Sequence, residues 1–230
     1  MSSALAIASV TQVLKDLLNN GLIDHDITGI VNGNVKVTAL PPDLVTTSND
    51  EPAQLNIFMY YVSPNTGWVN QYNPSGNYSG ERITNPPLAL DLHYLLTAWC
   101  SSELHSEILL GYGMQLMHEN PVLTREAIRK SLLPPGGISK AGLPLNLQSL
   151  SGSGLEKQVE MVKIIPESLT MEEMARIWSA LQSKYRPSAA YQASVVLIES
   201  DKPTHPVLPV QERHIKVRPE LLPESETTGI

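Results

Sequence analysis

The spacing of apolar residues along this 230-residue chain predicts helices in some segments and strands in others. Residues 5–19 carry apolar residues at helical spacing, which predicts an amphipathic helix. Its stripe consists of aliphatic side chains: Val10, Val13, Leu14, Leu17 and Leu18. Gly21 follows them, and a glycine in this place is typical of the left-handed residue that ends a helix.

Two more helices are predicted in the middle of the chain. Residues 103–118 have apolar side chains nearly all round the helix. Such a helix is expected to be covered by other elements or by a neighbouring subunit. Residues 124–132 predict a short helix with Thr124 as its N-terminal cap.

The start of a helix over residues 170–183 has the clearest local signals in the chain. Thr170 and Glu173 have the spacing of a capping box. Leu169 and Met174 flank them as a hydrophobic staple, in which apolar residues before and after the cap pack together. These signals predict where the helix begins.

Segments with alternating or continuous apolar residues predict strands: 35–39, 54–62, 87–100, 158–165 and 189–199. Both faces of the segment 54–62 are largely apolar, so this strand is expected to be central in its sheet. Strict alternation places Leu55, Ile57, Met59 and Tyr61 on one face. Helices and strands do not alternate regularly. The pattern therefore predicts an α+β fold with a mixed, mostly antiparallel sheet and helices packed on it.

The apolar run over residues 85–99, NPPLALDLHYLLTAW, is interrupted only by Asp91 and His93. Residues two apart in a strand point to the same face, so these side chains are expected to be neighbours. An Asp and a His on one face could act in acid–base or metal chemistry. They could equally be a hydrogen-bonded pair in a core or at a subunit interface. The residues alone leave both readings open.

Long loops are predicted over residues 63–85 and 134–154. The first contains Trp68, Tyr72 and Tyr78. Long loops in compact domains tend to be functional, and exposed aromatic residues are typical of contact surfaces. We therefore predict that these three residues contribute to an interface.

The last segment of the chain is expected to be separate from the core. Residues 201–230 are rich in proline and show alternation only over 213–217, so they predict an extended C-terminal arm. A strand formed by this alternating stretch could add to a partner's sheet through Ile215 and Val217. We accordingly divide the chain into a core domain, 1–200, and an arm.

Composition excludes several classes of function. Lys and Arg total 16 against 23 Asp and Glu, a net charge of −7. Without a basic stripe, a nucleic-acid surface is not expected. Cys100 is the only cysteine, so disulfides within the chain are excluded and it is expected to be a small buried apolar residue. The sequence shows neither a signal-peptide layout nor a transmembrane span, and a cytoplasmic protein is expected.

No motif for a cofactor or for catalysis is present. The glycines at 136–137 lack the spacing of a phosphate-binding loop, and those at 152–154 lack that of a nucleophile elbow. We predict no cofactor, no metal and no catalytic residue. The residue patterns by themselves indicate a soluble α+β interaction protein.

Six ordered blocks of the sequence resemble a known family, the cap or tail-terminator proteins of contractile injection systems of the virulence-cassette and antifeeding-prophage type. The resemblance covers about 85% of the chain and is carried by these blocks: ALAIASVTQVLKDLLNNGL (4–22), VTALPPD (37–43), QLNIFMYYVSPNTGW (54–68), GERITNPPLALDLHYLLTAW (80–99), EILLGYGMQLMHENPVLTREAI (107–128) and PESLTMEEMARIWSALQSKYRPSAAYQASVVLIE (166–199).

The resemblance implies a structural role without catalysis. Proteins of this family are similar to terminators that form a six-fold ring on the end of an inner tube and outer sheath. The implied partners are further copies of the chain, the tube protein and the sheath protein, assembling in the cytoplasm into a particle that is released or attached to a membrane. Some family members carry a larger C-terminal region. This sequence departs from that pattern, because it has only a short proline-rich tail there. It is therefore open whether a second cap paralogue or a membrane-anchoring partner shares the task.

Two alternatives of other classes remain. One is a small-molecule or metal-dependent enzyme that uses Asp91 and His93. The other is a monomeric adaptor that binds one partner through its C-terminal arm. The cap predicts a ring, the enzyme predicts an activity that depends on His93, and the adaptor predicts a monomer at all concentrations.

Overall fold

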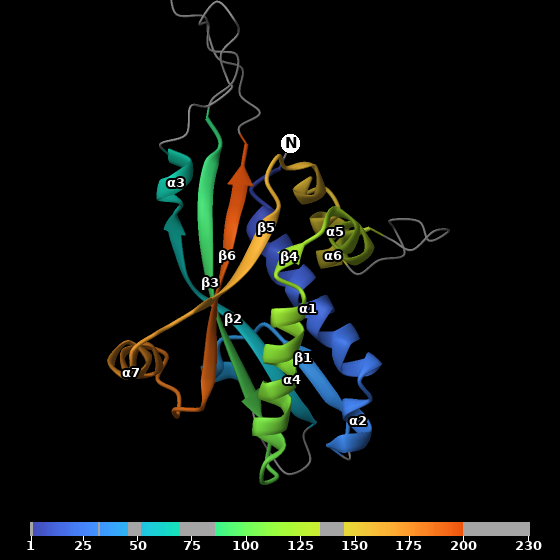
Figure 1. The fold of residues 1–230 in the computed structure, drawn as a ribbon, viewed down its shortest axis with the longest axis vertical. Helices are drawn as coiled ribbons and strands as arrows, with labels where there is room; N and C mark the ends of the chain where they lie inside the picture. The colour runs from blue at the N-terminus through green and yellow to red at the C-terminus, as the bar shows by residue number, and fades with distance from the viewer. Residues whose placement is uncertain (1, 32, 46–51, 70–85, 134–144, 200–230) are drawn as a thin grey trace, which may run out of the picture.

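A computed structural model describes most of the chain (Figure 1), namely residues 2–31, 33–45, 52–69, 86–133 and 145–199. Its strands form one mixed sheet in the order β1-β2-β3-β6-β5-β4. Their bounds are β1 Val35–Thr38, β2 Ala53–Pro64, β3 Leu88–Trp99, β4 Val122–Leu123, β5 Val162–Glu167 and β6 Ser188–Ile198. β1 and β2 are parallel and the other neighbouring pairs are antiparallel. The predicted α+β fold with a mostly antiparallel sheet is confirmed.

The helices of the described residues are distributed unequally over the sheet. They are α1 Ala6–Asp24, α2 Ile27–Ile30, α3 Thr66–Val69, α4 His105–Glu119, α5 Arg125–Leu132, α6 Leu145–Leu150 and α7 Met171–Ala180, with 3₁₀ turns at Pro42–Leu44 and Leu155–Lys157. α1, α4, α5 and α6 gather on one side, and α7 stands apart from them (Figure 1). The predicted boundary at residue 200 stays a prediction, because the arm lies outside the described residues.

The main core lies between the sheet and helices α1 and α4. Leu92, Tyr94 and Leu96 of β3 belong to it, and each is completely buried. The hydroxyl of Tyr94 lies 2.8 Å from that of Thr11 on α1, so the one polar atom of this large side chain is hydrogen-bonded. Burial raises the pKa of Tyr94 above its ordinary value.

Gly21 does not end α1, contrary to the sequence prediction. The helix continues through it to Asp24. A Cβ atom placed on Gly21 would lie 2.4 Å from Leu116 Cδ2 on α4. The glycine therefore allows α1 and α4 to pack closely, a role that depends on a residue far away in the sequence.

Helix α4 is buried on one face only. Leu109, Gly113 and Leu116 are among its buried residues, whereas Met114 is 44% exposed. Other elements of the same chain therefore cover only part of this apolar helix, and cover of the rest by a neighbouring subunit stays a prediction. α5 and α7 follow their predictions more closely, since Thr124 caps the first and a complete capping box begins the second.

A bulge in β2 changes the predicted faces of that strand. Met59 pairs with Tyr94 of β3, and the next pair is Tyr61 with His93. Tyr60 therefore has no residue opposite, as expected where one strand of a pair carries an extra residue. Beyond the bulge Tyr61 shares the face of His93, so its predicted place beside Met59 is wrong.

Candidate functional site

Asp91 and His93 lie on the face of β3 that is turned away from α1 and α4, because Leu90, Leu92 and Tyr94 alternate with them in the main core. Both are buried, with 7% and 8% of their surface exposed. Their placement on one face is confirmed. No direct hydrogen bond between the two is found among the described residues, and each has partners of its own.

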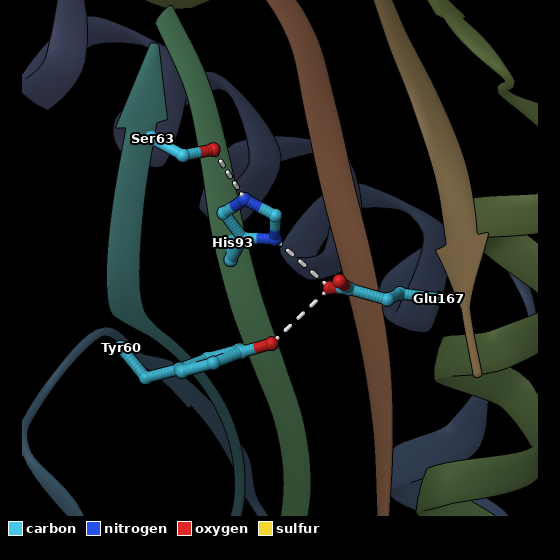
Figure 2. A network of polar contacts seen from close by, with 4 residues as sticks. All are labelled: Tyr60, Ser63, His93 and Glu167. Carbon is cyan, nitrogen blue, oxygen red and sulfur yellow. Dashed lines mark hydrogen bonds and ion pairs between the residues drawn. The ribbon is translucent and has the colours of Figure 1, made fainter. Parts of the chain in front are cut away.

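His93 connects three strands (Figure 2). Its Nε2 lies 2.9 Å from Ser63 Oγ on β2, and its Nδ1 lies 3.0 Å from Glu167 Oε2 on β5. The Glu167 side chain reaches across β6, where its paired residue is the small Ala190. Tyr60 donates a hydrogen bond of 3.1 Å to the same oxygen of Glu167.

These contacts determine which nitrogen of His93 carries the proton when the ring is neutral. A carboxylate accepts hydrogen bonds and cannot donate them, so Nδ1 holds its hydrogen toward Glu167. Nε2 is then left with a free electron pair, which accepts the hydrogen bond of the Ser63 hydroxyl. The arrangement is a serine, an imidazole and a carboxylate in series.

Tyr60 owes its place in this network to the bulge. Its ring centroid is 6.1 Å from that of His93, and Tyr61 approaches the same imidazole at 5.1 Å. Burial and the neighbouring charge of Glu167 raise the pKa of Tyr60. The phenol therefore stays protonated at neutral pH and remains a donor to the carboxylate.

Asp91 belongs to a second polar group next to the first. Asn65 Nδ2 donates to both carboxylate oxygens of Asp91, at 2.9 and 3.0 Å, and it also lies 3.2 Å from Ser194 Oγ on β6. The register of β3 and β6 shifts beside Asp91, between Leu90 and Leu92. The amide of Asn65 thus links the end of β2 to this irregular part of the sheet.

The predicted interface residues are divided between the described and the undescribed parts of the chain. Trp68 lies on α3 and is half-buried, and its backbone N–H donates to Asn65 Oδ1 at 2.9 Å. Tyr72, Tyr78, Ile215 and Val217 lie outside the described residues. Their role in an interface stays a prediction.

Sequence reasoning missed Ser63, Glu167 and Tyr60 as partners of His93. Ser63 falls one residue after the predicted end of its strand, and Glu167 falls two residues after the predicted end of another. Nothing local indicates that β5 and β3 lie on either side of β6.

An aromatic cluster lies farther along the same face of β3. Trp99 and Trp178 of α7 are buried, with ring centroids 6.3 Å apart. The guanidinium of Arg186 stands 4.3 Å above the Trp99 ring, within the range of a cation–π contact. α7 therefore covers the apolar end of this face, whereas His93 lies beyond the helix's buried contacts.

The remaining surface offers an open groove of about 450 Å³ between α1, α4 and α5. Charged and polar side chains line much of it: Asp16, Asn20, Asp24, His25, Glu119 and Lys130. Asp16 accepts hydrogen bonds from Gln12 and Ser131, so its carboxylate serves the packing of the helices.

Within the described ranges no group of three or more His, Cys, Asp or Glu side chains could hold a metal ion.

Two further findings concern Cys100 and the helices. Cys100 is half-buried, and desolvation by burial raises the pKa of its thiol, so little thiolate is present at neutral pH. None of the helices in the described part of the chain is long and apolar enough to cross a membrane.

Comparison with solved structures defines the class of fold. The chain matches a cryo-EM structure of an extracellular contractile injection system, described as a PVC sheath/tube terminator in the extended state, at a TM-score of 0.51 and 15% identity. A second match, the anti-feeding prophage tube-terminating cap, has a TM-score of 0.47 and 16% identity. The alignments cover 92% and 86% of this chain, which spans 63% and 60% of the length of those chains.

The family is shown by a sequence model that matches residues 9–212, described as the Pvc16 N-terminal domain. The chain therefore belongs to the Pvc16 N-terminal domain family. No match is found among curated proteins. The sequence resemblance to cap and terminator proteins of contractile injection systems is confirmed at the level of family.

Proposed function

We propose that this protein is a structural cap that forms a hexameric ring and ends the inner tube and outer sheath of a contractile injection system. The observation that carries the proposal is the family match over residues 9–212. The shared fold with a sheath/tube terminator supports it. The ring would stop further addition of tube and sheath subunits and couple the two cylinders, a task that requires no catalysis.

The proposed partners follow from this role. Copies of the chain contact one another in the ring through interfaces that close by rotation. The tube and the sheath bind on other surfaces. A released or membrane-attached particle, assembled in the cytoplasm, agrees with the role. The chain spans 63% of the length of the sheath/tube terminator that it matches. We further propose that a second cap paralogue or a membrane-anchoring partner shares the task.

Negative-stain imaging of the chain co-expressed with its tube and sheath proteins tests the proposal. We expect a six-fold density at one end of each tube, and uncapped tubes of irregular length when the chain is omitted. Tubes of regulated length with ordinary ends in its absence would contradict the cap. Mass measurement of the purified chain tests the adaptor alternative, which predicts a monomer on tubes as well as in solution.

Trp68 provides a sharper test of the interface. Truncating an aromatic hot-spot residue typically costs about 2 kcal/mol, roughly 30-fold in affinity. We expect Trp68→Ala to reduce the fraction of capped ends, whereas Tyr185→Ala, a matched change of an aromatic residue that is 52% exposed beside α7, should not. Equal effects of the two variants would remove Trp68 from the proposed interface.

Deletion of residues 201–230 tests the arm. We propose that the arm adds a strand to the sheath, with Ile215 and Val217 facing the partner. The truncated chain should retain its fold and its self-association but lose binding to the sheath. Unchanged sheath binding would refute the role of the arm and leave the role of the core domain intact.

A further inference from the structure

Beyond the capping role, we propose that Ser63 is an activated nucleophile that accepts an acyl group from small activated esters. The inference rests on the series Ser63 Oγ, His93 Nε2, His93 Nδ1 and Glu167 Oε2, joined at 2.9 and 3.0 Å. A catalytic triad is recognised by this geometry and by these roles, whatever the order of its members in the chain or the fold that carries them. The proposed acylation of Ser63 does not depend on ring formation or on the partners of the cap.

Each member has the partner that its role requires. When His93 is neutral, Glu167 keeps its proton on Nδ1, which frees Nε2 to accept the serine proton. Tyr60 holds the same oxygen of Glu167 at 3.1 Å, and burial with the adjacent carboxylate raises the pKa of this phenol, so it stays a donor. Glu167 therefore orients the imidazole of His93, and Tyr60 in turn holds the carboxylate of Glu167 in place (Figure 2).

The reaction balances without any further reagent than the ester and water. Ser63 Oγ forms a bond to the ester carbonyl carbon while its proton moves to His93 Nε2. The carbon–oxygen bond to the alcohol breaks, and the alcohol leaves with the proton from Nε2. An acyl-serine remains. Water, deprotonated by His93, would later attack the acyl carbon and restore Ser63.

The surroundings of Ser63 limit the substrate. Ser63 is half-buried, while Tyr61, on the same face, is 56% exposed and Ile165 of β5 is 43% exposed. A small acyl group can therefore approach from the sheet surface. We assign no oxyanion hole to this site, and preorganised oxyanion donors supply a large part of the rate in hydrolases. We accordingly expect one acylation per chain followed by slow deacylation.

The test exposes the purified full-length chain to p-nitrophenyl acetate and, separately, to a fluorophosphonate probe. We expect release of one equivalent of p-nitrophenol and a label on the peptide that contains Ser63, located by mass spectrometry. Ser63→Ala should abolish both. Ser106→Ala is the matched control, because Ser106 is half-buried like Ser63 but its hydroxyl donates to Glu107 Oε2 at 2.9 Å, and this change should leave both signals unchanged.

Glu167→Gln separates an activated serine from one that is merely accessible. Loss of the orienting carboxylate favours the wrong tautomer of His93, and the corresponding change in a serine protease lowers the rate about 10⁴-fold. We expect the labelling rate of Ser63 to fall at least about 100-fold, the lower range for general base catalysis. An unchanged rate in Glu167→Gln, or labelling that persists in a folded Ser63→Ala chain, would overturn the proposal.

Discussion

On one face of β3, Tyr94 and Leu96 pack against α1 and α4 in the main core. On the other face, His93 contacts polar side chains of β2 and β5, and α7 packs against the end near Trp99. Both faces are built from alternate residues of the same strand. They differ because the first buries mainly apolar side chains, whereas the second also buries Asp91 and His93, and buried polar groups require hydrogen-bond partners.

This difference explains how the two faces respond to small displacements of their side chains. An aliphatic side chain that shifts slightly within the main core still finds apolar neighbours. His93 keeps its hydrogen bonds only if Ser63 and Glu167 arrive at the correct atoms. The bulge at Tyr60 provides this geometry on the β2 side.

The largest expected effect comes from the apolar face. Leu95 and Leu96 are adjacent and equally buried, but Leu96 belongs to the large cluster and Leu95 to the small one under α7. We expect Leu96→Ala to lower the free energy of unfolding by about 3–5 kcal/mol and Leu95→Ala by about 2–3 kcal/mol, since a small cluster relaxes more readily into the cavity. Urea unfolding measures both, and a larger loss for Leu95→Ala would reverse the comparison.

A smaller effect is expected where the polar face loses its central member. His93→Leu removes the partner of Ser63 and of Glu167, and an unsatisfied buried polar group costs about 1–3 kcal/mol. The side chain of Glu167 is 26% exposed and can recover some hydration, so we expect a loss of stability toward the lower end of this range. The midpoint of urea unfolding measures it. A variant as stable as the wild type would show that this network contributes nothing to the fold.

The N-terminal caps allow the same comparison at the level of helices. α7, on the polar face, begins with a capping box in which Thr170 and Glu173 bond one another's backbone N–H groups, at 3.2 and 2.8 Å. α5, on the side of the sheet that carries α1 and α4, begins with a single capping residue, Thr124. Its hydroxyl oxygen accepts a hydrogen bond of 3.2 Å from the backbone N–H of Ala127. We expect Thr170→Ala to cost about 1 kcal/mol and Thr124→Ala somewhat less. Equal losses in urea unfolding would mean that the second bond of the box adds no stability.

The smallest effect at neutral pH is expected from Tyr60→Phe, and this small loss of stability should shrink or reverse at alkaline pH. Burial raises the pKa of Tyr60, Tyr94 and Tyr191 in the folded protein above the unfolded value of about 10. Above that pH the unfolded chain loses protons that the folded chain retains, so stability is complete below pH 10 and declines as the pH rises further.

Unfolding midpoints at pH 8 and pH 11 measure this decline. Tyr60→Phe should reduce it, because one of the raised groups is removed. If Tyr60→Phe does not change the difference between the two midpoints, the alkaline loss arises from the other tyrosines alone.

Local signals in the sequence predicted the elements whose cause is local. The capping box of α7 is an example, since both of its residues lie within one helical turn. The central strand β3 is a second example, because a long run of apolar residues is expected to be buried whatever the rest of the fold. The prediction that Gly21 ends α1 was wrong, because the residue that requires a glycine there, Leu116, is distant in the sequence. The same holds for Glu167, which meets His93 only after β6 has been placed between them.

The sequence by itself determined the α+β class, the apolar faces and the family to which the chain belongs, because each of these depends on residue types at short or repeated spacings. Only the tertiary structure decided that α1 and α4 touch at Gly21, that Tyr61 changes face, and that Ser63, His93 and Glu167 form a series. These features depend on strand register and on contacts between distant segments. A shift of one residue in the register would abolish them without altering the hydrophobic pattern that the sequence displays.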